Sequence, residues 1–422
     1  MGASDVLIVG AGPAGSSLAW RLARSGIRVR VLDARAFPRS KPCGDSISPG
    51  ATPILAEIGV VDALRAAGAA EISGWRVRAP DGTWFEGRYA EPGLAAPQTG
   101  FALARSELDA ILLRAATDAG AEFLPRRRAF DLLQRDGRVV GVRARGPDGE
   151  VEDHPAGFVV GADGLRSRIA RLLGGVRLGD RRRLVMVGRF EGVRESAPRN
   201  VHPTTPGGRL GQVRISRNGV LGYAPIGPHR CNVTLVLPAA DARRVAADPY
   251  AFFHSTVRRY GALECIEDGS LIGDLEVTGP FEVTPRHRTA PGALLVGDAA
   301  GYFDPLTGQG VFRALYGARL ASRAILEALS DPALEVASLG LYERNLDRSL
   351  VPSRRVQRMI DAVITRPELM GASARFLAEH PGIASLLIDV TGDRVPPGTL
   401  TRPRAWLGAW RQETDADRTR AA

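Results

Sequence analysis

The sequence of 422 residues has few of the residue types that form disulfides or bind metals. Its three cysteines are far apart and make no Cys-x-x-Cys pair, so neither a disulfide framework nor a zinc site is expected. The six histidines show no metal-ligand spacing, and we predict no bound metal. The N-terminus lacks the basic segment of a signal peptide, and no apolar run reaches the length of about 18 residues that a transmembrane helix needs. We therefore expect a cytoplasmic protein.

Lysine is almost absent, because Lys41 is the only one among 56 basic residues, and the net charge is +10. An excess of this size can indicate binding to nucleic acid or to an anionic membrane. Because the arginines are spread along the chain without a nucleic-acid-binding motif, we predict no nucleic-acid partner and attribute them to codon usage. Weak peripheral membrane contact through Arg354, Arg355 and Arg358 is left open, although a solvated helix face is the favoured interpretation. The choice between monomer and homodimer is open too.

The N-terminal 35 residues have the pattern of a nucleotide-binding β-α-β unit, which would hold the adenine half of a dinucleotide. A short apolar run over residues 5–10 predicts a buried strand. Residues 13–24 predict a helix that stops at Gly26, and residues 28–32 predict a second strand that ends at Asp33. The size and order of these segments are those of a β-α-β unit.

The loop between the first strand and the helix, residues 10–15 (GAGPAG), has the spacing of a dinucleotide-binding turn. Gly10 allows the tight turn, Gly12 lets a pyrophosphate approach the backbone, and Gly15 lets the helix pack closely on the strand. The helix N-terminus then favours the negative charge of the phosphates. Asp33, 21 residues after Gly12, is placed to accept hydrogen bonds from a ribose hydroxyl. This motif alone does not distinguish FAD from NAD.

Two later segments resemble a known group of FAD proteins. Residues 161–167 (GADGLRS) follow a predicted strand at 157–160, and residues 295–310 (LVGDAAGYFDPLTGQG) contain the end of another buried strand. Both are similar to segments of the group that includes the aromatic hydroxylases, the geranylgeranyl reductases and the flavin-dependent halogenases. Together with the glycine-rich loop they follow the order of that group over the first 330 residues. The resemblance identifies the chain as an FAD-dependent oxidoreductase.

The resemblance implies a set of cofactor contacts. Asp298 would bond a ribityl hydroxyl, Arg105 would reach the FAD, and Asp163 would support the fold near the adenosine side. The backbone of residues 307–310 would approach the isoalloxazine at a helix N-terminus, which favours the anionic reduced flavin. For Arg105 the alternative is a surface arginine that caps a turn. The complete set of predicted cofactor-binding residues is Gly10, Gly12, Pro13, Ala14, Gly15, Asp33, Ala34, Arg35, Cys43, Gly44, Arg105, Asp163, Gly297, Asp298, Pro305, Thr307, Gly308, Gln309 and Gly310.

The loop at residues 37–45 (FPRSKPCGD) resembles a loop of the geranylgeranyl reductase and halogenase-like branch, in which a Cys-Gly pair lies close to the flavin. Cys43 is therefore a candidate catalytic residue. It would act as a redox or acid/base group, or it is a small residue that the ring can approach, and we favour the second. Residues 304–310 (DPLTGQG) also resemble the reductase branch more than the hydroxylase branch.

Other features depart from the group. Residues 221–226 (LGYAPI) lack the tryptophans of the halogenase motif W-x-W-x-I-P, which argues against halogenation. They also lack the aromatic Tyr-x-Trp-x-Phe-Pro-like segment of geranylgeranyl reductases, which counts against isoprenoid reduction. No second G-x-G-x-x-G unit is present, so NAD(P)H would visit transiently as the reductant. Tyr223, His229 and His254 fall in the expected substrate region and are further candidate catalytic residues.

These patterns predict an α/β fold with a discontinuous Rossmann-like FAD-binding domain, an inserted antiparallel β-sheet substrate domain and a helical C-terminal region. The FAD-binding domain is assigned to residues 1–72, 97–175 and 282–335. The substrate-binding sheet is assigned to residues 73–96 and 176–281, and the helical region to residues 336–422. Proline breaks in that region are expected at Pro352, Pro367, Pro381, Pro396, Pro397 and Pro403.

The predicted function is that of an NAD(P)H- and O2-using monooxygenase, a hydroxylase or epoxidase. It would act on a hydrophobic secondary metabolite, such as a polyketide or aromatic compound, through a flavin C4a-hydroperoxide. Two alternatives remain open. One is a flavin-dependent reductase of an isoprenoid or quinone double bond, which the Cys43 loop and residues 307–310 support. The other is a non-catalytic flavoprotein electron carrier. The substrate pocket is expected between the FAD-binding domain and the sheet.

Overall fold

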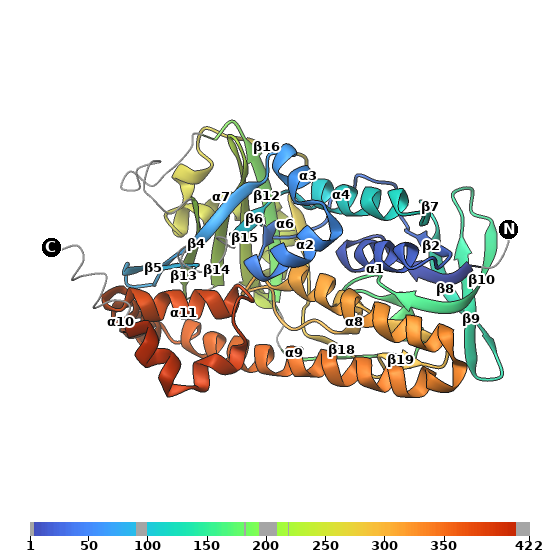
Figure 1. The fold of residues 1–422 in the computed structure, drawn as a ribbon. Coiled ribbons are helices and arrows are strands. Elements are labelled where there is room, and N and C mark those ends of the chain that lie inside the picture. The colour runs from blue at the N-terminus through green and yellow to red at the C-terminus, as the bar shows by residue number, and fades with distance from the viewer. Residues whose placement is uncertain (1–3, 90–98, 181–182, 194–208, 218, 411–422) are drawn as a thin grey trace.

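The structure is a computed structural model that describes residues 4–89, 99–180, 183–193, 209–217 and 219–410 (Figure 1). The predicted β-α-β unit is present at the N-terminus as β1 (Ser4–Val9), α1 (Pro13–Arg24) and β2 (Val29–Leu32). Proline at the first position of α1 suits a helix start, because its missing N–H would have no partner there. Residues 6–8 of β1 have no exposed surface, as expected for a strand that is buried on both faces.

β1 and β2 belong to a mostly parallel sheet on the right of Figure 1. Its other strands are β7 (Glu122–Leu124), β8 (Arg128–Arg135), β9 (Arg138–Arg145), β10 (Val151–Gly161), β19 (Thr289–Ala290) and β20 (Ala293–Leu295). β1 pairs in parallel with β2 on one side and with β10 on the other, and β10 pairs in parallel with β20. The glycine-rich loop therefore lies at the carboxyl edge of a central strand, where open α/β sheets bind their ligands.

Helices pack against this sheet and against one another. They are α4 (Arg105–Asp118), α5 (Arg168–Leu172), α8 (Gly310–Ser330) and α9 (Glu335–Ile364). α1 contacts both α4 and α8, and α9 runs along α8 at the lower edge of Figure 1. The hydroxyl of Tyr342 on α9 donates a 2.6 Å hydrogen bond to the carbonyl oxygen of Leu295, so the C-terminal helices are tied to the end of β20.

A second, larger sheet lies on the left of Figure 1. Its strands are β3 (Ser46–Ile47), β4 (Ala70–Arg78), β5 (Trp84–Arg88), β6 (Gly100–Ala102), β12 (Arg183–Glu191), β13 (Arg209–Ser216), β14 (Gly219–Gly227), β15 (Arg230–Pro238), β16 (Ser270–Leu271) and β17 (Glu276–Thr278). β4 and β5 form an antiparallel hairpin whose turn contains Asp81 and Gly82. β3 and β6 pair into this sheet although both lie within the ranges expected for the FAD-binding domain, so the domain boundaries stay predictions.

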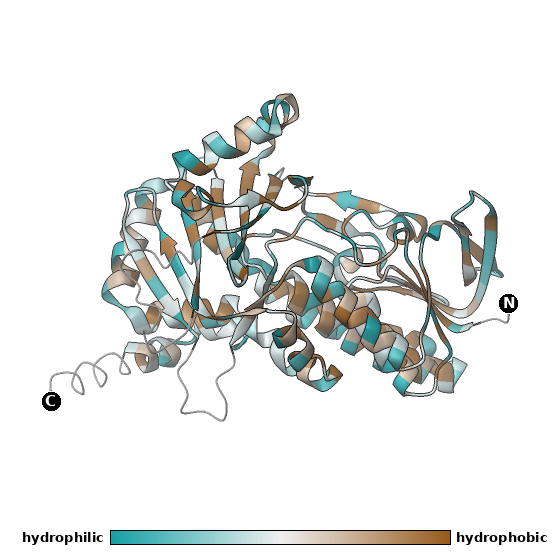
Figure 2. Ribbon diagram, turned by 90° about the horizontal axis from the view of Figure 1, so that it is seen from above, coloured by the Kyte–Doolittle hydropathy of each residue, from teal (hydrophilic) through white to brown (hydrophobic). Residues whose placement is uncertain are grey.

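Helices cover both faces of the second sheet. α6 (Ala242–Ala247) and α7 (Pro249–Arg259) lie on the outer face, where α7 packs on β-strand side chains. α10 (Pro367–Glu379) and α11 (Pro381–Thr391) lie on the inner face and contact β5. Hydrophobic residues, brown in Figure 2, are concentrated on the strands and helices of the interior. The remaining elements are α2 (Thr52–Ile58), α3 (Val61–Ala66), β11 (Val176–Leu178) and β18 (Val283–Pro285).

α9 corrects one expectation about the helical region. A break was expected at Pro352, but α9 continues through this proline. The proline removes one backbone hydrogen bond, whereas the buried residues Leu346, Leu350 and Gln357 on either side of it keep the helix packed on its neighbours. In the part of the chain that the structure describes, no helix combines the length and the apolar character that crossing a membrane requires.

Candidate active site

The glycine-rich loop after β1 contains two glycines that the fold itself requires. A side chain on Gly10, whose φ is +106°, would place its Cβ 2.4 Å from the carbonyl oxygen of Ala162. A Cβ on Gly15 would lie 1.9 Å from the carbonyl oxygen of Gly10. Any side chain at either position would therefore push the loop, α1 and the end of β10 apart.

Gly12 differs from these two glycines because the space above it is open. An added Cβ would have as its nearest neighbours only the Nη2 atoms of Arg39, at 3.7 Å, and of Arg105, at 4.0 Å. Arg105 is held by hydrogen bonds of 2.8 and 2.9 Å to the carboxylate of Asp109. Two guanidinium groups thus face the N-terminus of α1, and this arrangement suits a pyrophosphate. The sequence indicated Arg105 but gave no signal for Arg39.

Asp33 fastens the glycine-rich loop to the end of β2. Its Oδ2 accepts a 2.9 Å hydrogen bond from the N–H of Ala11, and its Oδ1 accepts a 3.0 Å hydrogen bond from the N–H of Arg35. Oδ2 also accepts a 3.5 Å hydrogen bond from Nη2 of Arg39, so it is Oδ1 that keeps a lone pair for a further donor. The geometry is compatible with the expected ribose contact, which stays a prediction.

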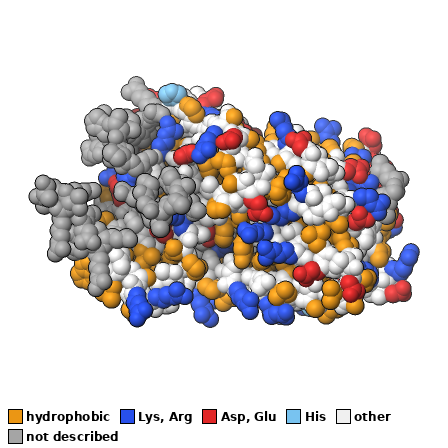
Figure 3. All heavy atoms as spheres, viewed as in Figure 1, with side chains coloured by type: hydrophobic (Ala, Val, Ile, Leu, Met, Phe, Trp, Pro, Cys, Tyr) orange, Lys and Arg blue, Asp and Glu red, His pale blue; other side chains and the backbone are white. Residues whose placement is uncertain are grey.

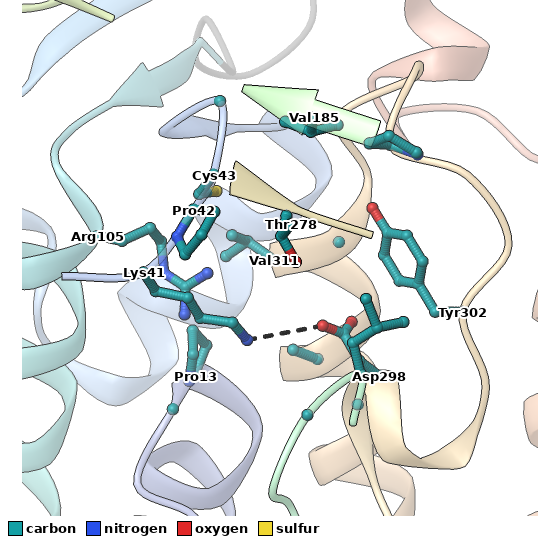
Figure 4. Close-up of a pocket in the computed structure, with 18 of the residues that line it drawn as sticks. Pro13, Lys41, Pro42, Cys43, Arg105, Val185, Thr278, Asp298, Tyr302 and Val311 are labelled. Atoms are coloured by element: carbon teal, nitrogen blue, oxygen red, sulfur yellow. Dashed lines mark ion pairs between the residues drawn. The ribbon is translucent and has the colours of Figure 1, made fainter. Parts of the chain in front are cut away.

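A cavity opens where the predicted cofactor segments meet (Figure 4). We call it the cofactor cavity. In Figure 4, Lys41 points across it toward Asp298, and Tyr302 faces it from another side. The predicted cofactor residues that line it are Gly12, Pro13, Ala14, Cys43, Gly44, Arg105, Gly297, Asp298, Pro305, Gly308 and Gly310.

The only lysine of the chain borders the cofactor cavity. Nζ of Lys41 lies 3.7 Å from Oδ2 of Asp298, and the two side chains are 32% and 24% exposed. A partly exposed ion pair of this kind contributes little to stability. Both side chains can therefore turn to a ligand in the cavity without a large loss of folding free energy.

These groups allow a test of whether the residues present fit FAD. Arg39 and Arg105 supply cations beside the open backbone at Gly12, as the two phosphates need. Asp33 and Asp298 supply carboxylates that can accept hydrogen bonds from ribose and ribityl hydroxyls. The polar groups in the cavity (Arg105, Asp298) and beside it (Arg39, Asp33) therefore match those of the cofactor, and the residues fit it.

The loop that carries Cys43 is fastened by residues that the sequence analysis missed. Nδ2 of Asn232 on β15 donates to the carbonyl oxygen of Cys43 at 2.8 Å and to Oδ2 of Asp45 at 2.7 Å. Nε of Arg189 on β12 also donates to Oδ2 of Asp45, at 2.6 Å. Burial raises the pKa of Asp45, while Arg189 and Asn232 act in the opposite direction. No local pattern marks these anchors, because they lie 189 and 144 residues from their partners.

The thiol of Cys43 stays protonated at neutral pH. Burial raises its pKa, although the nearby cation of Arg105 acts in the opposite direction. A protonated thiol is a poor redox nucleophile, because the thiolate is the reactive form. It does hold a proton that can be donated to a ligand. The redox role considered from the sequence is therefore disfavoured, while the acid role is open.

A larger cavity, which we call the apolar cavity, adjoins the cofactor cavity. Its volume of about 620 Å³ lies in the usual range for ligand pockets. The inner face of the second sheet and α9, α10 and α11 form its walls. No Asp, Glu, Lys, Arg or His is found among its described lining residues. The two cavities share six lining residues, which form the shared wall: Gly44, Ser46, Thr234, Val236, Pro305 and Gly308.

The segment before α8 contributes to the shared wall with its backbone. The side chain of Gln309 turns into a buried polar network instead. Its Nε2 donates to Oδ1 of Asp393 at 2.6 Å, and its Oε1 accepts from Nη2 of Arg313 at 2.9 Å. Thr307 lines the apolar cavity. Contacts of this segment with a flavin would therefore be made by its backbone, in keeping with the resemblance.

Some predicted residues lie outside the cofactor cavity. Asp163 accepts hydrogen bonds from the hydroxyl of Ser167 and from the N–H of Arg168, so it stabilises the start of α5. Ala34 and Arg35 are exposed just after the end of β2. Asp163 therefore supports the fold next to the site. Ala34 and Arg35 follow β2 at the surface and do not line the cofactor cavity.

The candidates in the expected substrate region differ in position. Tyr223 borders the apolar cavity. His229 is exposed in the turn between β14 and β15, and His254 is exposed on α7 at the outer face of the sheet. Neither histidine lines the cofactor cavity or the apolar cavity, and the catalytic role of both stays a prediction without support from these positions.

Known proteins resemble this chain in sequence and fold. The FAD binding domain family matches residues 3–207. The digeranylgeranylglycerophospholipid reductase 2 of Methanothermobacter thermautotrophicus is 30% identical over 92% of this chain and 99% of its own length. The menaquinone reductase of Mycolicibacterium smegmatis is 30% identical over 76% of this chain and 75% of its own. The solved structure of the myxobacterial chondrochloren halogenase CndH covers 82% of this chain and 80% of its own, with a TM-score of 0.76 and 25% identity.

The relatives correct the function that was predicted from the sequence. The prediction of an O2-using monooxygenase of secondary metabolites is wrong, because these two sequence relatives, which match most of the chain at 30% identity, are reductases. The aromatic motif missing from residues 221–226 was given too much weight, since it is one short segment of a pocket that many elements build. The chain belongs to the family of FAD-dependent oxidoreductases that contains the digeranylgeranylglycerophospholipid reductases.

Proposed function

We propose that the protein is an FAD-dependent reductase that saturates carbon–carbon double bonds of an isoprenoid chain. The apolar cavity is the observation that carries this proposal, because it joins the cofactor cavity and has no charged residue among its described lining residues. An isoprenoid chain has repeated double bonds and no charge, so it can be buried there without desolvating an ion. The names of a digeranylgeranylglycerophospholipid reductase and a menaquinone reductase among the relatives support the same reaction class.

Saturating one double bond adds two electrons and two protons to the substrate. A bound flavin supplies two-electron redox chemistry, and NAD(P)H is the proposed reductant. Cys43 holds a proton on Sγ next to Gly44 of the shared wall, so this thiol is placed to deliver one proton to the substrate. The apolar side chains around the substrate exclude water from the reacting carbon atoms.

A single-turnover experiment without oxygen tests the proposal. The holoprotein is reduced with dithionite and mixed with a geranylgeranyl-bearing phospholipid in detergent. We expect the flavin to be reoxidised and the lipid to gain two hydrogens for each double bond, as measured by mass spectrometry. The fully saturated lipid is the control and should leave the flavin reduced. A flavin that stays reduced in the presence of the geranylgeranyl lipid, with unchanged lipid mass, would contradict the proposal.

A further inference from the structure

Exposed hydrophobic side chains surround the mouth of the apolar cavity. Met359 on α9, Phe376 on α10 and Trp406 in the helical residues 403–410 line the cavity, yet they are 49%, 46% and 38% exposed. Clusters of large apolar side chains on a surface mark interaction sites. Further exposed apolar residues on the same elements, which do not line the cavity, are Leu369, Leu407 and Trp410.

The same surface carries an excess of positive charge. Within residues 351–410, six arginines but only two glutamates are exposed. Arg402 and Arg404 flank the mouth, and no ion pair of either is found among the described residues. In Figure 3, basic side chains lie among hydrophobic ones along the lower edge, where α9 and α10 run in Figure 1. The exposed arginines are Arg355, Arg358, Arg366, Arg375, Arg402 and Arg404.

We propose that this surface docks on an anionic phospholipid bilayer, so that the apolar cavity takes its isoprenoid chain directly from the membrane. The aromatic and aliphatic side chains would enter the boundary between headgroups and acyl chains, and the arginines would lie at the lipid phosphates. The identity of the chain in the cavity rests on the proposed function, whereas the docking rests on the surface alone.

Charge favours a bilayer over a second copy of this chain as the occupant. A two-fold contact would bring the same surface against itself, and its excess of positive charge, which remains after Arg375 pairs with Asp81, would repel its copy. A bilayer that contains anionic lipids presents the complementary sign. The absence of charged side chains among the described lining residues then has a simple consequence: a charged headgroup stays at the mouth, and only the hydrocarbon chain enters.

Vesicle flotation with the holoprotein tests the docking. Wild-type protein should float with vesicles of phosphatidylglycerol and phosphatidylcholine and should stay behind with pure phosphatidylcholine. Arg402→Gln with Arg404→Gln should weaken binding at low salt by about fivefold for each arginine. The triple variant Leu369→Ser, Leu407→Ser, Trp410→Ser should weaken it by about tenfold or more. Both variants avoid the cavity lining, so their activity on detergent-dispersed lipid should equal that of the wild type.

A matched control is Val151→Ser, which removes a residue that is 57% exposed on β10, at the opposite end of the molecule. This variant should float like the wild type. Equal flotation of wild type and both surface variants would overturn the docking. Failure of the wild-type protein to float with anionic vesicles would overturn it as well. A wild-type dimer that the triple variant converts to a monomer, with flotation unchanged, would assign the surface to self-association instead. Flotation as expected without any lipid reduction would support the docking and contradict the proposed function.

Discussion

Nε2 of Gln309 donates a 2.6 Å hydrogen bond to Oδ1 of Asp393, across 84 residues of sequence. The other carboxylate oxygen of Asp393 accepts a 2.9 Å hydrogen bond from the hydroxyl of Ser48. Gln309 directly precedes α8 and Asp393 follows α11, so this contact joins the segment beside the shared wall to the C-terminal helices. Burial raises the pKa of Asp393 to about 7, although the cation of Arg313 acts in the opposite direction.

The raised pKa of Asp393 predicts a loss of stability as the pH rises. In the unfolded chain an aspartate loses its proton near pH 4, whereas in the folded protein Asp393 keeps it to about pH 7. Between these values the folded state binds the extra proton, so the free energy of unfolding falls with pH by an amount on the order of a few kcal/mol. Asp393→Asn has no such proton to lose and should show a flatter profile in urea unfolding from about pH 4 to about pH 8.

The control for this measurement is Asp62→Asn, because the side chain of Asp62 is 98% exposed. Its profile should follow that of the wild type. If Asp393→Asn and the wild type lose stability in parallel as the pH rises, another group is responsible for the dependence.

Gly12→Val should separate cofactor binding from folding. The open space above Gly12 can hold the side chain, which would then occupy the place of the phosphates between Arg39 and Arg105. We expect purified Gly12→Val to be folded but to lack the yellow colour of bound flavin, as measured by absorbance and circular dichroism. Gly10→Val should instead fail to fold, because its Cβ would lie 2.4 Å from a backbone oxygen.

Gly398→Ala is the control for these two variants, since a Cβ at Gly398 has no atom within 4 Å. It should retain flavin and fold normally. A Gly12→Val protein that carries flavin in full amount would show that the phosphates lie elsewhere.

Cys43→Ala should lower the turnover number by about a hundredfold if the thiol donates a proton to the substrate. The flavin content and the KM for the lipid should change little, because alanine keeps the small size of the residue next to the cavity. Cys265→Ala is the control. Cys265 is buried in the hydrophobic cluster between α7 and the second sheet, and it lines neither cavity. Full turnover of Cys43→Ala would show that the thiol is not the proton donor. Cys43 would then be a small residue that the flavin ring can approach, which is the interpretation favoured from the sequence.

A larger side chain in the apolar cavity should exclude the isoprenoid chain. Leu387 on α11 lines the cavity, whereas its neighbour Leu386 does not. Leu387→Trp should raise the KM for a geranylgeranyl lipid by about tenfold or more, with flavin binding unchanged. Leu386→Trp is the matched control and should behave like the wild type in steady-state kinetics. Equal effects of the two substitutions would indicate a loss of packing and not a blocked cavity.

Local spacing was sufficient to predict the β-α-β unit, while the later cofactor segments were assigned from their resemblance to known FAD proteins. Gly10, Gly12 and Asp33 are close in sequence, so the geometry of one loop between two elements determines where they lie. The anchors of the Cys43 loop could not be found in this way. Asn232 and Arg189 reach that loop only because the second sheet is folded against it, and a lone Asn or Arg in a strand carries no signal of a distant partner.

The same distinction explains why the function was predicted incorrectly. The cofactor segments are common to oxygenases and reductases, so they do not distinguish between the two reactions. The apolar cavity, which we propose holds the substrate, left no local signal either, because its walls are assembled from β4, β5, β13, β14, β15 and three helices that lie far apart in the chain. The continuation of α9 through Pro352 was not predicted either, since the packing that sustains the helix comes from other elements.

The shared wall limits which substitutions can change substrate binding without also changing cofactor binding. Gly44, Thr234 and Pro305 face both cavities, so a substitution there would disturb the cofactor and the substrate together. The residues of α10 and α11 that line a cavity line the apolar cavity and not the cofactor cavity. Over evolutionary time, new substrate preferences can therefore arise by changing these two helices, while the wall is constrained by a cofactor that does not change. An engineer who wishes to redirect the enzyme should begin with the helices for the same reason.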